Sequence, residues 1–169
     1  MANLARSFPP IAAPDARRLI LGSMPGVASL EAGWYYAHPR NAFWPILAEL
    51  AGFEVATPYE ERCEALRAAG FAVWDVLKSC RRAGSLDTAI ERESERPNDF
   101  RTFFDEHPKL ELVAFNGQKA ENAFSRHVLG DLPEELAAKL TRIRLPSTSP
   151  AHAGRSFDQK LSAWRKSLC

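Results

Sequence analysis

The chain has 169 residues, the size of one domain with one core, and we predict a single domain over residues 1–169. Its 22 lysines and arginines nearly balance its 21 aspartates and glutamates, so net charge neither favours nor excludes a nucleic-acid partner. No apolar run approaches the roughly 20 residues that cross a bilayer, so we expect a cytoplasmic protein without a membrane partner. The 3 cysteines are widely spaced, which matches neither a disulfide framework nor a zinc site.

Four apolar segments predict the strands of a sheet. Residues 1–17 are rich in proline and show little periodicity, so we expect an irregular lead-in there. The first strand is predicted at residues 18–23, RLILGS, and the second at residues 71–77, FAVWDVL. The segment LELVAF at residues 110–115 predicts the third strand, and residues 143–145 mark the fourth.

Apolar residues at helical spacing predict helices between these strands. The helices are expected from Phe43 to about Leu50, from about Pro58 to Ala69, within residues 86–108, after Gly117 and around Trp164. Strands that alternate with helices indicate an α/β domain whose mostly parallel sheet is covered on both faces. Ligands bind such sheets where loops leave the carboxyl ends of the strands, which here are GSMPG, WDVLKSCRR, FNGQKA and LPSTSPAHA.

The stretch GSMPGVASLEAGWYYAHPRNAFW at residues 22–44 has the composition of a pocket. Its opening loop, residues 22–26, combines glycines that let backbone approach a ligand with a proline that fixes the turn. Aromatic and polar side chains then crowd together: Trp34, Tyr35, Tyr36, His38, Arg40, Asn41 and Phe43. Flat faces and hydrogen-bonding edges suit a planar heterocycle, although a purely structural turn explains the loop by itself.

Two other strand exits could bind phosphate. Residues 147–154 offer hydroxyls and backbone amides to an oxyanion, and Lys78, Arg81 and Arg82 form a basic cluster after the second strand. A plain Ser/Pro loop and a solvated basic face are the alternatives. The sequence lacks GxxxxGK[ST], GxGxxG after a strand, HExxH and GxSxG, which argues against the common nucleotide, zinc-protease and hydrolase sites.

At these residues the sequence resembles the uracil-DNA glycosylase superfamily, and within it the hypoxanthine-DNA (deoxyinosine) glycosylases. The resemblance rests on five blocks in order, GSMPG, YYAHPRNAFW, GFAVWDVLKSCRRAGSLD, FNGQKAE and LPSTSPAHA. It implies a three-layer α/β/α sandwich with a central four-stranded, mostly parallel sheet. It also implies that a base is flipped out of double-stranded DNA and excised without a metal or other cofactor.

The resemblance implies a catalytic role for Asn41. Many superfamily members place an acid or an asparagine in the first loop, where this sequence has Ser23 and Met24. The role therefore passes to Asn41, whose amide could orient water and donate to the base or sugar. The alternative role for Asn41 is a helix N-cap.

The resemblance also implies which residues surround the base and the DNA. Asp75 is expected to contact the flipped base, with a salt bridge to Arg81 or Arg82 as its alternative. The expected base pocket comprises Gly22, Ser23, Met24, Pro25, Gly26, Tyr36, Phe43, Asp75 and Asn116. DNA contacts are expected from Arg40, Lys78, Arg81, Ser147, Ser149, Ala151 and His152, the last four in a loop similar to one that enters the minor groove.

The sequence therefore predicts a monofunctional DNA glycosylase that hydrolyses the N-glycosidic bond of deaminated bases, hypoxanthine first, in base excision repair. A uracil or mismatch-thymine glycosylase is the alternative within this class, and a catalytically idle DNA- or nucleoside-binding protein is the alternative outside it. The motifs place no lysine as a Schiff-base nucleophile, so we expect no strand cleavage. The expected partner is double-stranded DNA containing a deaminated base, bound by a monomer.

Overall fold

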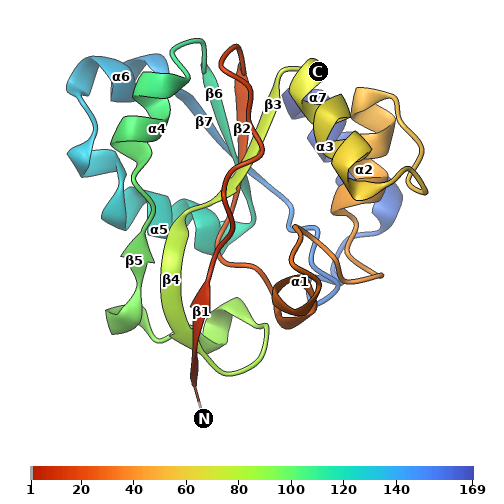
Figure 1. The fold of residues 1–169 in the computed structure, drawn as a ribbon, viewed down its shortest axis with the longest axis horizontal. Helices are drawn as coiled ribbons and strands as arrows, with labels where there is room; N and C mark the ends of the chain where they lie inside the picture. The colour runs from red at the N-terminus through yellow and green to blue at the C-terminus, as the bar shows by residue number, and fades with distance from the viewer. Residues whose placement is uncertain (1) are drawn as a thin grey trace.

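The computed structural model describes residues 2–169 and is built around a parallel sheet (Figure 1). Its strand order is β3-β2-β6-β7, with every neighbouring pair parallel. The strands are β2 (Arg18–Gly22), β3 (Phe71–Asp75), β6 (Leu112–Asn116) and β7 (Thr141–Leu145). The predicted four-stranded parallel sheet is confirmed, because each strand lies at a segment that the apolar pattern marked.

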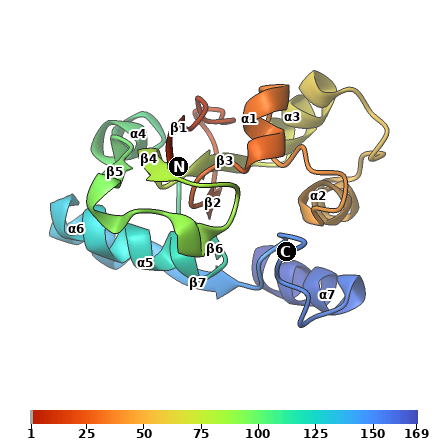
Figure 2. The same cartoon turned by 90° about the horizontal axis from the view of Figure 1, so that it is seen from below.

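Helices cover both faces of this sheet, as Figure 2 shows. One face carries α2 (Phe43–Ala51), α3 (Tyr59–Ala68) and α7 (Phe157–Leu168). The other carries α4 (Phe100–Glu106), α5 (Gln118–His127) and α6 (Glu134–Lys139), while α1 (Val27–Ala32) lies at the carboxyl edge. Within residues 2–169, no helix has both the length and the apolar character needed to cross a membrane.

A second, antiparallel sheet corrects two predictions. Its order is β1-β4-β5, formed by β1 (Asn3–Arg6), β4 (Leu77–Arg82) and β5 (Arg96–Pro97). The lead-in is therefore not irregular throughout, and the basic stretch after the second strand is itself a strand. Neither segment has a strand-like apolar pattern, and β1 forms through its pairing with β4, which is far away in the sequence.

Residues 86–108, expected to form two helical pieces broken near Pro97, form an α-helix only after that proline, where α4 buries Phe100, Phe103 and Phe104 as expected. They also form two short 3₁₀ turns, η1 (Asp87–Ala89) and η2 (Arg92–Ser94), before β5 and α4. A further 3₁₀ turn, η3 (Leu129–Asp131), follows α5. Tertiary pairing of β5 with β4 overrides the weak helical pattern of this region.

Aromatic side chains fill the core on both faces of the parallel sheet. Phe43 of α2 packs edge-on against Trp164 of α7, with ring centroids 6.2 Å apart. On the other face, Phe124 of α5 contacts Phe100 of α4 at 5.7 Å and Phe115 of β6 at 5.3 Å. The helices are therefore held to the sheet mainly by apolar burial.

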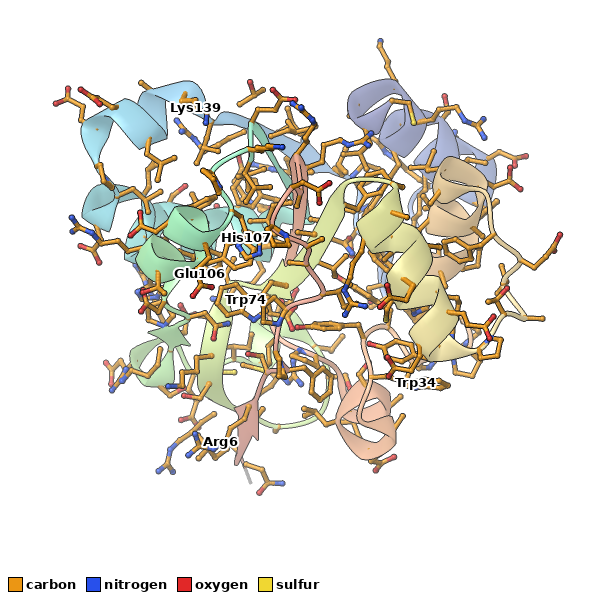
Figure 3. The ribbon with its side chains drawn as sticks, turned by 45° about the horizontal axis from the view of Figure 1, so that its top comes forward. Arg6, Trp34, Trp74, Glu106, His107 and Lys139 are labelled. Atoms are coloured by element: carbon orange, nitrogen blue, oxygen red, sulfur yellow. The ribbon has the colours of Figure 1, made fainter. Side chains whose placement is uncertain are left out.

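Hydrogen bonds attach the lead-in to the parallel sheet. The Trp74 indole donates to the Phe8 carbonyl at 3.0 Å, and the Ile11 amide donates to the Val73 carbonyl at 2.9 Å. Figure 3 shows Trp74 and His107 near α4, with Trp34 on the opposite side of the molecule. Trp34 packs there on Tyr59 of α3, at 4.9 Å between centroids.

The Arg18 guanidinium ties two helices to the sheet. It donates to the carbonyl of Ala69 at 2.6 Å and to the carbonyl of Leu168, and it lies over the Phe71 ring at 4.2 Å. These carbonyls stand at the ends of α3 and α7, where a positive charge also interacts favourably with the helix dipole.

We predict that Arg18→Met lowers the free energy of unfolding by about 2 kcal/mol or more, because hydrogen bonds from a charged donor to both helix ends are lost. The matched control is Arg17→Ala, whose exposed side chain reaches Glu111 only at 3.7 Å. It should change stability by less than about 0.5 kcal/mol. Urea unfolding curves check both values, and equal effects would contradict the role given to Arg18.

Candidate active site

A cavity of about 860 Å³ opens at the carboxyl edge of the parallel sheet. All four strand exits contribute to its wall, as the sequence predicted. The predicted residues that line it are Gly22, Ser23, Met24, Pro25, Gly26, Tyr36, Asn41, Asp75, Asn116, Ser147, Ser149, Ala151 and His152. The four exits meet because the carboxyl ends of parallel strands share one edge.

Four predicted site residues lie outside the cavity wall. Phe43 is fully buried and stacks behind Tyr36, so its expected place in the base pocket is corrected to a supporting one. Arg40 is exposed, and Lys78 and Arg81 are exposed on β4. The contacts of these three residues with DNA stay predictions.

The expected basic cluster is divided in the structure. Arg82 is buried, and its guanidinium donates to the carbonyls of Pro25 and Gly84 (2.8 Å to Gly84). It therefore fixes the first loop instead of facing solvent with Lys78 and Arg81. Arg81 and Arg82 diverge because successive residues of a strand point to opposite faces.

Sequence reasoning missed one wall of the cavity. Leu86, Asp87, Thr88 and Ile90 line it, next to Gln118 and Lys119 of the expected exit FNGQKA and to Asn122 of α5. Residues 85–90 return to the cavity because the chain passes from β3 of the parallel sheet into β4 of the antiparallel sheet and then turns back. Nothing in the local pattern of these residues carries that signal.

Gly22 lets two polar groups meet on the cavity floor. A side chain there would place its Cβ 2.5 Å from the Asp75 carboxyl oxygen Oδ1 and 2.9 Å from the Tyr36 hydroxyl. Tyr36 has a φ of 55°, which is costly for a residue with a side chain, and its ring stacks on Phe43 at 3.9 Å. Strain of this kind persists where the surrounding packing enforces it, which is common at functional sites.

Asp75 is a buried carboxyl group that forms no ion pair among the described residues. Among residues 2–169, neither its Oδ2 nor the Tyr36 hydroxyl has a hydrogen-bond partner, and Asp75 forms no ion pair with Arg81 or Arg82. The salt-bridge alternative is therefore wrong. Burial, aided by the charge of Asp87 and opposed by Arg82, raises the pKa of Asp75 to about 8. Asp75 is thus mostly protonated at neutral pH and can both donate and accept a hydrogen bond.

Asn41 combines a local structural bond with a free donor. Its side-chain oxygen accepts from the Phe43 amide at 2.9 Å, and its own backbone amide donates to the His38 carbonyl at 2.9 Å. The hydrogen bond to the Phe43 amide holds the first residue of α2, which resembles the N-cap role expected for Asn41. The Asn41 side-chain nitrogen makes no hydrogen bond among the described residues, so it is available to a ligand in the cavity.

Asn116 joins two of the strand exits. Its side chain donates to the Thr148 hydroxyl at 2.9 Å and accepts from the Thr148 amide at 2.9 Å. In the same loop, the Ser147 and Ser149 hydroxyls each accept a backbone amide at 3.2 Å. The loop that carries the predicted phosphate contacts is therefore internally hydrogen-bonded.

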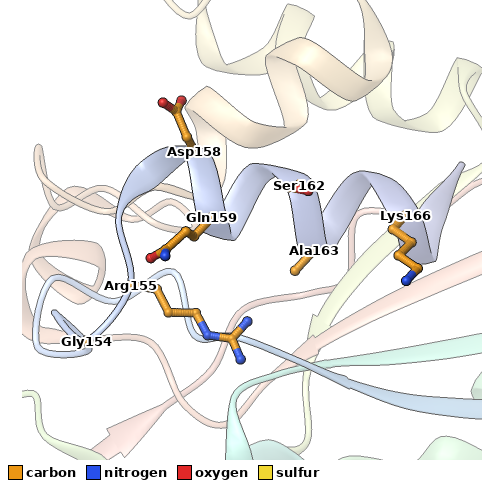
Figure 4. A pocket seen from close by; sticks show the side chains of 7 residues that line it. All are labelled: Gly154, Arg155, Asp158, Gln159, Ser162, Ala163 and Lys166. Atoms are coloured by element: carbon orange, nitrogen blue, oxygen red, sulfur yellow. The ribbon is translucent and has the colours of Figure 1, made fainter.

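A second hollow, of about 680 Å³, follows the surface of α7 (Figure 4). Its lining includes Arg155, Asp158, Gln159 and Lys166, whose side chains extend from α7 and the turn before it. All four are exposed. This surface hollow contains no buried polar group comparable to Asp75, so the larger cavity is the candidate active site.

Comparison with known proteins agrees with this geometry. The family model for the uracil DNA glycosylase superfamily matches residues 9–168. The chain belongs to that superfamily.

Two curated relatives of this superfamily member are named hypoxanthine DNA glycosylase. The protein from Methanosarcina barkeri is 33% identical over 164 residues, which are 96% of this chain and 97% of the relative. The protein from Methanosarcina acetivorans is 36% identical over 118 residues, 69% of this chain and 73% of the relative. A solution NMR structure of a candidate uracil DNA glycosylase from Methanosarcina acetivorans superimposes with a TM-score of 0.77 at 30% identity and covers 97% of this chain and 98% of that one.

The high pKa of Asp75 predicts an unusual pH dependence for this superfamily member. Its folded pKa of about 8 exceeds the ordinary unfolded value of about 4, so the folded state binds the extra proton between those pH values. Unfolding free energy should therefore fall as pH rises through this window, by up to about 1.4 kcal/mol per pH unit. Asp75→Asn should remove this decrease with pH, and its free energy of unfolding should exceed that of the wild type by the largest amount at about pH 8.

Urea unfolding at about pH 5, 6.5 and 8 measures this difference. Asp99→Asn is the control of opposite sign, because hydrogen bonds from Thr102 lower the pKa of Asp99. That variant should be less stable than the wild type at neutral pH, and the difference in unfolding free energy should shrink as the pH is lowered. If the difference in unfolding free energy between Asp75→Asn and the wild type does not change with pH, the prediction that Asp75 is neutral in the folded protein is wrong.

Proposed function

We propose that this protein is a monofunctional DNA glycosylase that hydrolyses the N-glycosidic bond of hypoxanthine in double-stranded DNA. The names of the two curated relatives support the substrate, and membership of the superfamily supports the reaction. The observation that carries the proposal is the pair of unpartnered polar groups, Asp75 and Tyr36, on the floor of the cavity. Unpartnered buried polar groups are costly, and a ligand that pairs with them recovers that cost.

Asp75 suits the hydrogen-bonding edge of a 6-oxopurine. Hypoxanthine presents an N1–H donor beside its O6 acceptor, and a protonated carboxyl offers the complementary acceptor and donor. A hydrogen bond donated to O6 also stabilises the negative charge on the departing base. Uracil presents an equivalent N3–H and O4 edge, which makes it the second candidate substrate.

The remaining cavity residues have roles that follow from their positions. Tyr36 offers its ring to a flipped base, backed by Phe43, and Asn41 offers its free amide nitrogen to the base or the sugar. Ser147 and Ser149 stand where hydroxyls could hold phosphates beside the flipped nucleotide. No lysine acts as a nucleophile in this scheme, so the reaction ends with release of the base and an abasic site. The active form in this scheme is a monomer.

The substrate is tested with duplex oligonucleotides that each hold one hypoxanthine, uracil or mismatched thymine, followed by alkali to reveal abasic sites. We expect hypoxanthine to be released fastest, with intact strands until alkali is added. DNA binding without release of any base would identify a catalytically idle binding protein instead.

We predict that Asn41→Asp slows base release by at least about 100-fold while leaving the fold intact. The variant keeps the oxygen that accepts from the Phe43 amide, but it loses the free nitrogen donor and adds negative charge. Asn41→Ala, the companion variant, should also cost about 1 kcal/mol of stability, because the bond at the start of α2 is lost. Single-turnover rates and urea unfolding separate the two effects, and near-normal release by Asn41→Asp would refute the catalytic donor.

A further inference from the structure

A second carboxyl group, Asp87, reaches the cavity from the wall that the sequence did not predict. The Ser23 hydroxyl donates to its Oδ1 at 2.6 Å, and both residues line the cavity. Ser23 is buried in the first loop, whereas Asp87 opens η1 at the mouth of the cavity. The hydrogen bond therefore joins two segments far apart in the sequence across the edge of the site.

Asp75 and Asp87 are the two carboxyl groups lining the cavity in the part of the chain that the structure describes. Asp75 sits on the buried floor with a high pKa, so it retains its proton, while Asp87 has a hydroxyl donor that stabilises a charge. The pKa of Asp87 is also raised, because burial outweighs the Ser23 hydrogen bond and the positive charges of Arg82 and Lys119. A raised pKa makes a carboxylate a better proton acceptor, and the donor from Ser23 distinguishes Asp87 from the unpartnered Asp75.

The cations near Asp87 act on it only at a distance. Arg82 uses Nε and Nη2 on two backbone carbonyls and leaves Nη1 without a hydrogen-bond partner within residues 2–169, and Lys119 forms an ion pair with the buried Glu95. Among the described residues, Asp87 forms no ion pair of its own. Its charge therefore remains available to a substrate in the cavity.

We propose that Asp87 is a catalytic carboxylate that faces the deoxyribose and accepts a proton from the attacking water. This inference rests on the proposed function, since it concerns the same reaction. The bond between C1′ and the base nitrogen breaks with its electron pair on the base, and positive charge develops on the sugar. A nearby carboxylate stabilises that charge.

The step balances with one water consumed. The water oxygen bonds to C1′, and one of its protons passes to the Asp87 carboxylate, which later releases it to solvent. The departing base takes one proton from solvent. The products are the free base and an abasic deoxyribose.

Asp87→Asn separates this role from a purely structural one. Asparagine keeps a side-chain oxygen that can accept from the Ser23 hydroxyl, but it has no charge and cannot take the proton. We expect the single-turnover rate on the hypoxanthine duplex to fall at least about 100-fold. Binding to a duplex whose deoxyinosine carries a 2′-fluorine, which slows cleavage, should be as tight as for wild type or tighter, since a negative charge near the phosphates is lost.

The matched control is Glu91→Gln, which removes an exposed carboxylate just beyond the cavity wall and should leave the rate unchanged. Asp87→Ala should regain part of its lost rate when formate is added, because formate can occupy the space of the missing carboxylate. Rates of Asp87→Asn within about threefold of wild type, or an Asp87→Ala that formate does not rescue, would overturn the inference alone. A wild-type protein that releases no base from any duplex would overturn the proposed function and this inference together.

Discussion

The parallel pairing of β2 with β3 is the constraint on which the site depends. The register sets Gly22 opposite Asp75 at the carboxyl edge, so the carboxyl group lies over a residue without a side chain. Tyr36, held in a left-handed conformation and stacked on Phe43, places its hydroxyl against the same glycine. Any side chain at Gly22 would occupy the space of both polar groups, so the cavity floor follows directly from the sheet.

The electrostatics of the cavity follow from where its two carboxyl groups lie. The buried floor removes Asp75 from water and favours its neutral form, whereas Asp87 lies at the mouth with a hydroxyl donor. In the proposed reaction, Asp75 donates a hydrogen bond to the base and Asp87 accepts a proton from water. This division of roles needs no cationic partner on the floor.

Hydrogen bonds behind the cavity wall keep these groups in place. Asn116 clasps Thr148, Arg82 holds the carbonyl of Pro25, and Asn41 holds the start of α2. Each of these polar side chains supports a loop that follows a strand or starts a helix. A site built on strand exits gains its precision from such bonds, because loops are otherwise the mobile parts of a fold.

Local patterns in the sequence were enough to predict the parallel sheet, its helical layers and the four loops that form most of the cavity, because apolar periodicity and turn residues are local signals. The resemblance to the superfamily also marked Asn41, Asp75 and Tyr36. Contacts between distant segments were needed to establish the second sheet, the raised pKa of Asp75, the supporting place of Phe43 and the presence of Asp87 in the cavity. Each of these depends on contacts between residues distant in the chain, on burial and on the path by which β4 returns the chain to the site, and no local pattern records them.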